Sequence, residues 1–117
     1  LISKKSNNYL KLPKINQKIK HAYHLFIVLI NFDELKGGRA KLMKDLKRIG
    51  IQTQVNYIPI YYHPFYKKML GNITLKESER FYNKCLSLPI HPNMEIKDVD
   101  FIVNNLFFTI DNNKRSY

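Results

Sequence analysis

The segment from residue 56 to residue 66, NYIPIYYHPFY, holds most of the side chains of this sequence that could bind or orient a ligand. It places tyrosine hydroxyls and one imidazole between two prolines, and proline restricts the backbone that carries the neighbouring rings. Such a loop can line a pocket, with the hydroxyls and the imidazole as its polar contacts. It can equally form a hydrophobic cap over a sheet, and composition alone leaves the two interpretations nearly even.

The other reactive groups form no recognisable catalytic or metal-binding pattern. The histidines are His21, His24, His63 and His91, and no two of them have the i, i+4 spacing of a helical metal site. We expect His24 to be a core residue of a buried strand, whereas His63 in the aromatic loop is open to either role. Cys85 has no base beside it and should pack on an apolar helix face. The pair Gly37–Gly38 matches no phosphate-binding motif.

Two strands would position the aromatic segment. Residues 23–30, YHLFIVLI, form an apolar run of the length expected for a strand buried on both faces. Residues 51–58, IQTQVNYI, alternate, so one face is packed and the other is polar. Asn56 falls on the polar face and Tyr57 on the packed face. Pro59 should end this strand or leave it at an edge, because proline cannot donate to a ladder.

Three helices are expected around these strands. The first runs from Arg39 to Gly50, the second begins at a capping box of Thr74 and Glu77, and the third follows residue 95. Their apolar faces are Leu42, Met43, Leu46 and Ile49; Leu75, Ser78, Tyr82, Cys85 and Leu86; and Val99, Ile102, Val103 and Leu106. With a short strand at residues 87–90, the pattern predicts an α+β fold, a small antiparallel-type sheet of about three strands packed against three helices.

The 117 residues have the size of one domain, with a connector at residues 1–20, the domain at 21–110 and a polar tail at 111–117. The chain begins at Leu1, and we expect it to be a fragment of a longer polypeptide. Its longest apolar run is too short to span a membrane. The single cysteine excludes an intrachain disulfide and favours a reducing, cytoplasmic setting.

The net charge of +11 allows two interpretations. It can mark a small basic module that binds RNA or another polyanion, or it can reflect lysines on solvated surfaces. The aromatic residues cluster in a loop, and the predicted strand at 51–58 carries no lysine or arginine. A nucleic-acid platform would interleave aromatic and basic residues along strands, so we favour the second interpretation and expect no nucleic-acid partner.

Four blocks, in order, resemble a known family. They are YHLFIVLI, GRAKLMKDLKRIGIQTQVNYIPIYYHPFYKK, CLSLPIHPNM and KDVDFIVNNL, and they cover roughly residues 21 to 108. They resemble the C-terminal part of the DegT/DnrJ/StrS-type sugar aminotransferases, and the second block is the most specific. Within this family the sequence looks closest to enzymes that aminate a UDP-linked 4-keto-6-deoxy amino sugar on the way to pseudaminic-acid-type nonulosonic acids.

The resemblance implies a fold-type-I enzyme that is a homodimer. A large N-terminal domain would hold pyridoxal phosphate on a lysine, glutamate would donate the amino group, and the small C-terminal domain would cover the site. No lysine here lies in the sequence context of the Schiff-base lysine. The resemblance therefore implies no catalytic and no cofactor-binding residue in this chain, which should be inactive alone.

The resemblance also places Asn56, Tyr57, Tyr61 and His63 at the nucleotide-sugar substrate. The family's second block commonly reads Val-His-Tyr-x-Pro-x-His, and Asn56 and Tyr61 stand where it has histidine. Both side chains can hydrogen-bond a sugar, but neither titrates near neutral pH. We therefore expect them to position the substrate rather than to exchange protons with it.

Overall fold

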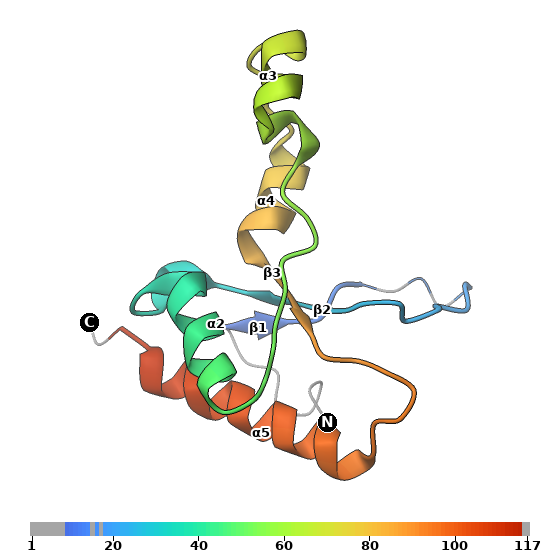
Figure 1. Ribbon diagram of the computed structural model, residues 1–117, viewed down its shortest axis with the longest axis vertical. Coiled ribbons are helices and arrows are strands. Elements are labelled where there is room, and N and C mark those ends of the chain that lie inside the picture. Colours follow the sequence, from blue (N-terminus) through green and yellow to red (C-terminus); the bar gives the residue numbers. More distant parts are fainter. Residues whose placement is uncertain (1–8, 15, 17, 116–117) are drawn as a thin grey trace.

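The computed structural model describes residues 9–14, 16 and 18–115. Its sheet has the order β1-β2-β3 and is formed by β1 (Leu10–Lys11), β2 (Phe26–Ile30) and β3 (Cys85–Leu88). Both pairings are antiparallel, with Leu10 opposite Ile30 and Phe26 opposite Leu88. The predicted three-stranded antiparallel sheet is therefore confirmed, with β2 at its centre (Figure 1).

The described residues form four α-helices besides this sheet. They are α2 (Gly38–Arg48), α3 (Pro64–Leu70), α4 (Lys76–Lys84) and α5 (Ile96–Asn113), with 3₁₀ turns η1 (Phe32–Glu34) and η2 (Ile60–Tyr62). Helices α2 and α5 pack against each other on one side of the sheet, whereas α3 and α4 rise away from its other side (Figure 1). The helix α3 was not expected, because it begins at Pro64, inside the segment 56–66 that was expected to be a loop.

The hydrophobic core lies between the sheet and the pair α2 and α5. Side chains from each layer are fully buried in it, among them Val28, Ile30, Leu42, Leu46, Leu106 and Ile110. On α2, the residues Leu42 and Leu46 form the face that packs in the core, and they lie one helical turn apart as their spacing in the sequence predicts. Ile49, placed on the same face by its spacing, is 41% exposed because α2 ends at Arg48.

The expected strand at residues 51–58 is not formed. Only Gln54 joins the sheet edge, through two backbone hydrogen bonds with Ser87: the Gln54 N–H donates to the Ser87 carbonyl at 3.1 Å, and the Gln54 carbonyl accepts from the Ser87 N–H at 2.8 Å. The third strand comes instead from β1, inside the segment expected to be a connector. Strand β2 is also shorter than predicted, so His24 lies before it and is exposed rather than buried.

Two helix boundaries differ from the expected ones. The capping box of Thr74 and Glu77 is absent, since α4 begins at Lys76 with Leu75 as its N-cap and no side-chain cap bond. A capping box does occur at the start of α5, between Glu95 and Asp98. Cys85 opens β3 instead of extending the helix, and burial raises the pKa of its thiol.

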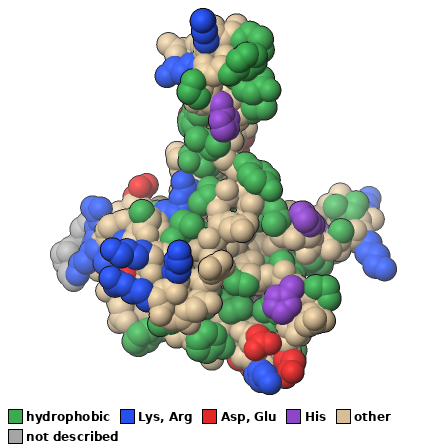
Figure 2. Space-filling view, in the orientation of Figure 1, with side chains coloured by type: hydrophobic (Ala, Val, Ile, Leu, Met, Phe, Trp, Pro, Cys, Tyr) green, Lys and Arg blue, Asp and Glu red, His purple; other side chains and the backbone are tan. Residues whose placement is uncertain are grey.

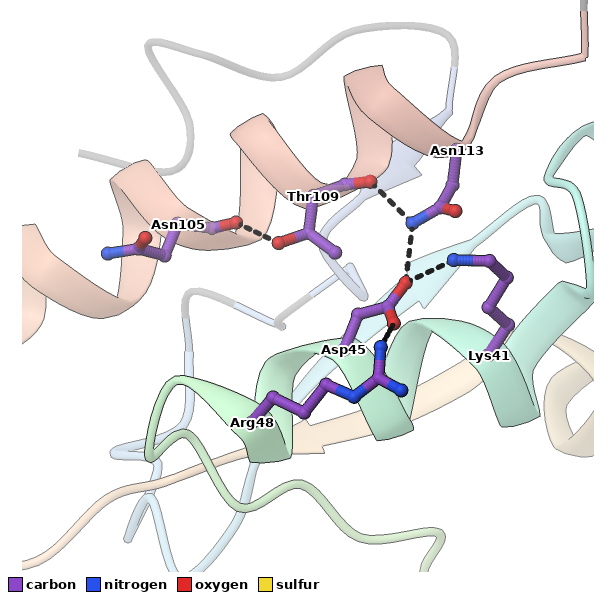
Figure 3. Close-up of polar contacts among 6 residues, drawn as sticks. All are labelled: Lys41, Asp45, Arg48, Asn105, Thr109 and Asn113. Carbon is purple, nitrogen blue, oxygen red and sulfur yellow. Dashed lines mark hydrogen bonds and ion pairs between the residues drawn. The ribbon is translucent and has the colours of Figure 1, made fainter.

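Helix α5 also reaches beyond the boundary predicted for the polar tail. It continues to Asn113, which is buried, and the backbone N–H of Lys36 donates to the carbonyl of Asn113 at 2.7 Å. The Asn113 side chain donates to Asp45 Oδ2 at 3.1 Å and to the Thr109 carbonyl at 2.9 Å (Figure 3). The end of α5 is therefore held to Lys36, just after η1, and to α2.

Asp45 is the carboxylate that joins α2 to α5. Lys41 and Arg48 of its own helix pair with it, and Asn113 contacts it from α5 (Figure 3). The hydrogen bond from Lys41 is the largest cause that lowers the pKa of Asp45, followed by the one from Asn113. Because of these partners, Asp45 is ionised more readily in the folded chain than in the unfolded chain.

Acid should therefore remove a stabilising contribution of Asp45. A carboxyl whose pKa is depressed by folding stabilises the fold above its unfolded pKa of about 4, and this contribution is lost as pH falls through the folded pKa. We expect Asp45→Asn to reduce the difference in urea midpoint between pH 7 and pH 3. Glu77→Gln, which removes an exposed carboxylate paired with Arg80, should leave that difference unchanged. An undiminished acid effect in Asp45→Asn would show that other carboxyls carry it.

Candidate functional site

The residues that the sequence analysis assigned to a ligand lie where the chain leaves the body of the molecule. We define the arm as residues 60–84, which contain η2, α3 and α4 (Figure 1). Neither α3 nor α4 has a buried residue, and large apolar side chains such as Phe65 and Met69 are exposed on the arm (Figure 2). Asn56 and Tyr57 precede the arm, while Tyr61 and His63 lie in its first four residues, 60–63, which we call the base of the arm because the arm begins there in the chain.

Asn56 has an incompletely satisfied amide. The side chain is half-buried, its Nδ2 lies 3.5 Å from Gln54 Oε1, and its Oδ1 is buried without a hydrogen-bond partner among the described residues. A buried acceptor without a donor destabilises the fold, so a water molecule, a ligand or another part of the protein would complete it. Asn56 is therefore suited to receive a further polar group.

Tyr57 departs from its expected place. Burial alternates from Ile51 to Val55 as predicted, but Tyr57 is 73% exposed instead of continuing the packed face. The alternation ends because the segment leaves the sheet edge after its one bridge at Gln54. The phenol of Tyr57 is consequently open to solvent.

In an extended loop, Tyr61 and His63, which are two residues apart, would face the same side. In the structure they do not. The turn η2 rotates the chain between them, so Tyr61 is 6% exposed while His63, the N-cap of α3, is exposed. The Tyr61 hydroxyl donates to Glu79 Oε1 of α4 at 3.3 Å. Tyr61 thus packs the base of the arm, and the structure spreads the four predicted residues along the chain instead of gathering them in one cluster.

A chain of aromatic contacts extends from Tyr61. Its ring meets Tyr62 edge-on at 5.0 Å between centroids, and Tyr62 meets Tyr82 of α4 edge-on at 6.2 Å. The guanidinium of Arg39, from α2, lies 4.7 Å from the centroid of the Tyr82 ring. We call these residues, Arg39, Tyr82, Tyr62 and Tyr61, the aromatic ladder.

Two phenols of the ladder, those of Tyr61 and Tyr62, have pKa values above the ordinary value of tyrosine. Burial raises the pKa of Tyr61 and of Tyr62, and the nearby carboxylate of Glu79 raises both further. Beside the ladder lies a cavity of about 420 Å³, lined by Tyr61, Tyr62, Lys67, Glu79 and residues 71–74. It offers phenol donors, a carboxylate acceptor and an ammonium, which are groups that bind hydroxylated ligands.

Sequence reasoning did not identify Arg39 or Glu79 as part of this site. Arg39 donates through Nη1 to the carbonyl of Tyr82, 43 residues away, and no local pattern reports a contact of that range. The only available signal was Tyr82 itself, an aromatic residue on a helix face next to a predicted sheet.

The described residues do not fit a pyridoxal phosphate site. Its Schiff base needs a lysine with a depressed pKa or an adjacent activating group. Among the residues that the structure describes, every lysine is exposed except the half-buried Lys114, and the hydrogen bond that Lys114 donates to Asp111 raises the pKa of Lys114 instead. Within the same residues, no group of three His, Cys, Asp or Glu side chains could hold a metal ion. None of the helices described is long and apolar enough to cross a membrane.

The solved structures that share this fold include aminotransferases. The chain superposes on Helicobacter pylori PseC, titled an aminotransferase involved in the biosynthesis of pseudoaminic acid, with a TM-score of 0.79 and 28% identity. That match covers 92% of this chain and 29% of PseC. TlmJ from Streptoalloteichus hindustanus, an aminotransferase with 18% identity, has the same fold, with a TM-score of 0.78 over 92% of this chain and 28% of that one.

Sequence comparison gives the family. Residues 3–107 match the model of the DegT/DnrJ/EryC1/StrS aminotransferase family, and this chain belongs to that family. It is 37% identical over 111 residues to the UDP-4-amino-4,6-dideoxy-N-acetyl-beta-L-altrosamine transaminase of Campylobacter jejuni, covering 95% of this chain and 29% of the relative. It is 39% identical over 104 residues to an uncharacterised protein of Methanocaldococcus jannaschii, covering 87% and 27% respectively. The chain thus spans less than a third of the length of these relatives.

Proposed function

We propose that this chain is the C-terminal small domain of a pyridoxal-phosphate-dependent nucleotide-sugar aminotransferase. The whole enzyme transfers an amino group from glutamate to the 4-keto carbon of a UDP-linked 4-keto-6-deoxy amino sugar. It works as a homodimer in the cytoplasm, on a route to pseudaminic acid and cell-surface polysaccharide. Pyridoxal phosphate is held by a large domain outside this chain and supplies the electron sink of the reaction.

The observation that carries the proposal is the similarity to the Campylobacter jejuni transaminase, because it extends over 95% of this chain at 37% identity. The likeness to PseC, 28% identical, supports the same substrate class. The misfit between the described lysines and a Schiff base agrees with a cofactor site located elsewhere in the polypeptide. In this enzyme the small domain covers the active site and lines the sugar pocket.

The role of this chain is then to bind and orient the sugar. Tyr57 and His63 offer exposed polar groups, and Asn56, which precedes Tyr57 in the chain, offers a half-buried amide. Tyr61 fixes the loop that carries them by donating to Glu79. Asn, Tyr and His side chains can together hydrogen-bond several hydroxyls of a sugar, and fixing them in advance lowers the entropy lost on binding.

The test is an assay of the full-length polypeptide with pyridoxal phosphate, glutamate and a UDP-linked 4-keto-6-deoxy amino sugar. We expect aminated sugar and 2-oxoglutarate in equal amounts, and no turnover with UDP-N-acetylglucosamine, which has no 4-keto group. The 117-residue chain alone, incubated with pyridoxal phosphate and borohydride, should give no stoichiometric adduct on one lysine. Absence of turnover with the keto sugar, or such an adduct, would refute the proposal.

A further inference from the structure

The direction of the arm is not fixed by a hydrophobic core. Helices α3 and α4 have no buried residue, and Tyr61 is the buried side chain at the base of the arm. Helix α4 ends at Lys84 and β3 begins at the next residue, Cys85, so the junction has no separate linker. Specific contacts at this junction must therefore hold the arm relative to the sheet.

Arg39 supplies the contacts that the junction needs. It lies in the first turn of α2, and its Nη1 donates to the Tyr82 carbonyl and is 3.5 Å from that of Cys85. The last carbonyls of a helix lack partners within the helix and carry partial negative charge, so a cation there is favourable. The planar guanidinium can bond both carbonyls while stacking on a ring, which the ammonium of lysine cannot do.

The same guanidinium is held between two elements. It lies 5.6 Å from the centroid of the Phe32 ring in η1 and 4.7 Å from that of Tyr82 in α4. A cation over an aromatic face is attracted by the ring quadrupole, and partial burial strengthens this attraction. Arg39 therefore joins the body of the molecule, at η1 and α2, to the end of α4.

The aromatic ladder connects Arg39 to the base of the arm. Tyr82 contacts Tyr62, Tyr62 contacts Tyr61, and Tyr61 donates to Glu79, which returns to α4. The path connects Arg39 to the turn η2 that precedes His63. It is a contiguous set of packed rings and hydrogen bonds, the kind of network that can carry energetic coupling between separate positions.

We propose that Arg39 is a positioning residue that sets the direction of the arm through the aromatic ladder. The part of the proposal that concerns catalysis rests on the proposed function, because it assumes that the base of the arm meets the sugar. Arg39 touches neither cofactor nor reacting atoms in this proposal, and it acts through Tyr82, Tyr62 and Tyr61.

Hydrogen exchange of the chain tests the structural part, whatever the protein catalyses. In Arg39→Met, amides of α4 and η2 should exchange about 5- to 30-fold faster, since one or two kcal/mol of local interaction is lost. Amides of α5 serve as an internal reference and should be unchanged. Lys44→Met removes a charge from the exposed side of the same helix and should alter neither region. Equal exchange of the arm in Arg39→Met and Lys44→Met would overturn the proposal.

Arg39→Lys separates geometry from charge and replaces Arg39→Met if that variant does not fold. Lysine keeps the positive charge but lacks the planar guanidinium with its several donors. We therefore expect the exchange rates of the arm amides to lie between those of the native chain and those of Arg39→Met. Wild-type exchange in Arg39→Lys would show that charge alone is sufficient and would contradict positioning by the guanidinium. A uniform rise that includes α5 would also contradict it, because it would indicate global destabilisation.

Kinetics of the full-length enzyme test the catalytic part. Arg39→Met should raise KM for the sugar about 5- to 30-fold, while the half-reaction with glutamate keeps its rate. Arg39→Lys should recover part of the loss. If arm exchange changes but KM does not, the ladder positions the arm without serving the sugar. If the native enzyme does not aminate the sugar, the proposed function fails while the exchange result stands.

Discussion

Replacing Leu46 by alanine is expected to lower the free energy of unfolding by about 2–5 kcal/mol. Leu46 is fully buried in the core cluster on α2, the helix that packs against α5 beneath the sheet. The truncation removes apolar contacts and leaves a cavity that surrounding helices cannot fill without shifting. The free energy of unfolding of a single domain is about 5–15 kcal/mol, so the loss is a large share of the total.

Ile49→Ala is the matched control for Leu46→Ala. The spacing of apolar residues assigns both to one helix face, but Ile49 is 41% exposed just beyond the end of α2. We expect this variant to cost less than about 1 kcal/mol in urea unfolding followed by circular dichroism. Comparable losses in the two variants would mean that the end of α2 is packed as tightly as its centre.

The predictions from sequence succeeded where a pattern is local and periodic. The run ending at Ile30 gave the central strand, and the spacing of Leu42 and Leu46 gave the core face of α2. Val103 and Leu106 likewise gave the core face of α5. In the two helices, burial on one face leaves its own period in the sequence, whereas the central strand shows as an unbroken apolar run.

Predictions failed where pairing decides the structure. Residues 51–55 alternate in burial as a strand does, yet only Gln54 pairs with β3, because alternation reports burial and not ladder formation. Strand β1 consists of Leu10 and Lys11 and is too short to show any period. Its place in the sheet follows from its pairing with β2, which the sequence does not display.

The candidate site was predicted in the same uneven way. The aromatic segment stands out in the sequence, since tyrosines and prolines concentrate there. Because of the turn η2, Tyr61 is buried and His63 is exposed, whereas an extended loop would place both on the same side. Arg39 and Glu79 were missed because they meet the segment only after α2 and α4 have folded beside it.

Asn56→Ala in the full-length enzyme should raise KM for the sugar about 5- to 150-fold, as expected from loss of one hydrogen bond worth 1–3 kcal/mol. The buried Oδ1 without a partner among the described residues is the reason for choosing this side chain. The half-reaction with glutamate should keep its rate, because Asn56 would contact only the sugar. Exchange of arm amides should not change either, since Asn56 precedes the arm.

Tyr61→Phe provides the contrast to Asn56→Ala. It removes only the hydroxyl that donates to Glu79, so it should loosen the arm in hydrogen exchange and raise KM for the sugar together. Gln52→Ala, at an exposed position earlier in the same segment, should alter neither quantity. If Asn56→Ala and Tyr61→Phe both leave sugar kinetics unchanged, or if either abolishes the glutamate half-reaction, these residues do not line the sugar pocket. A raised KM with faster arm exchange in Asn56→Ala would instead assign Asn56 to the support of the arm.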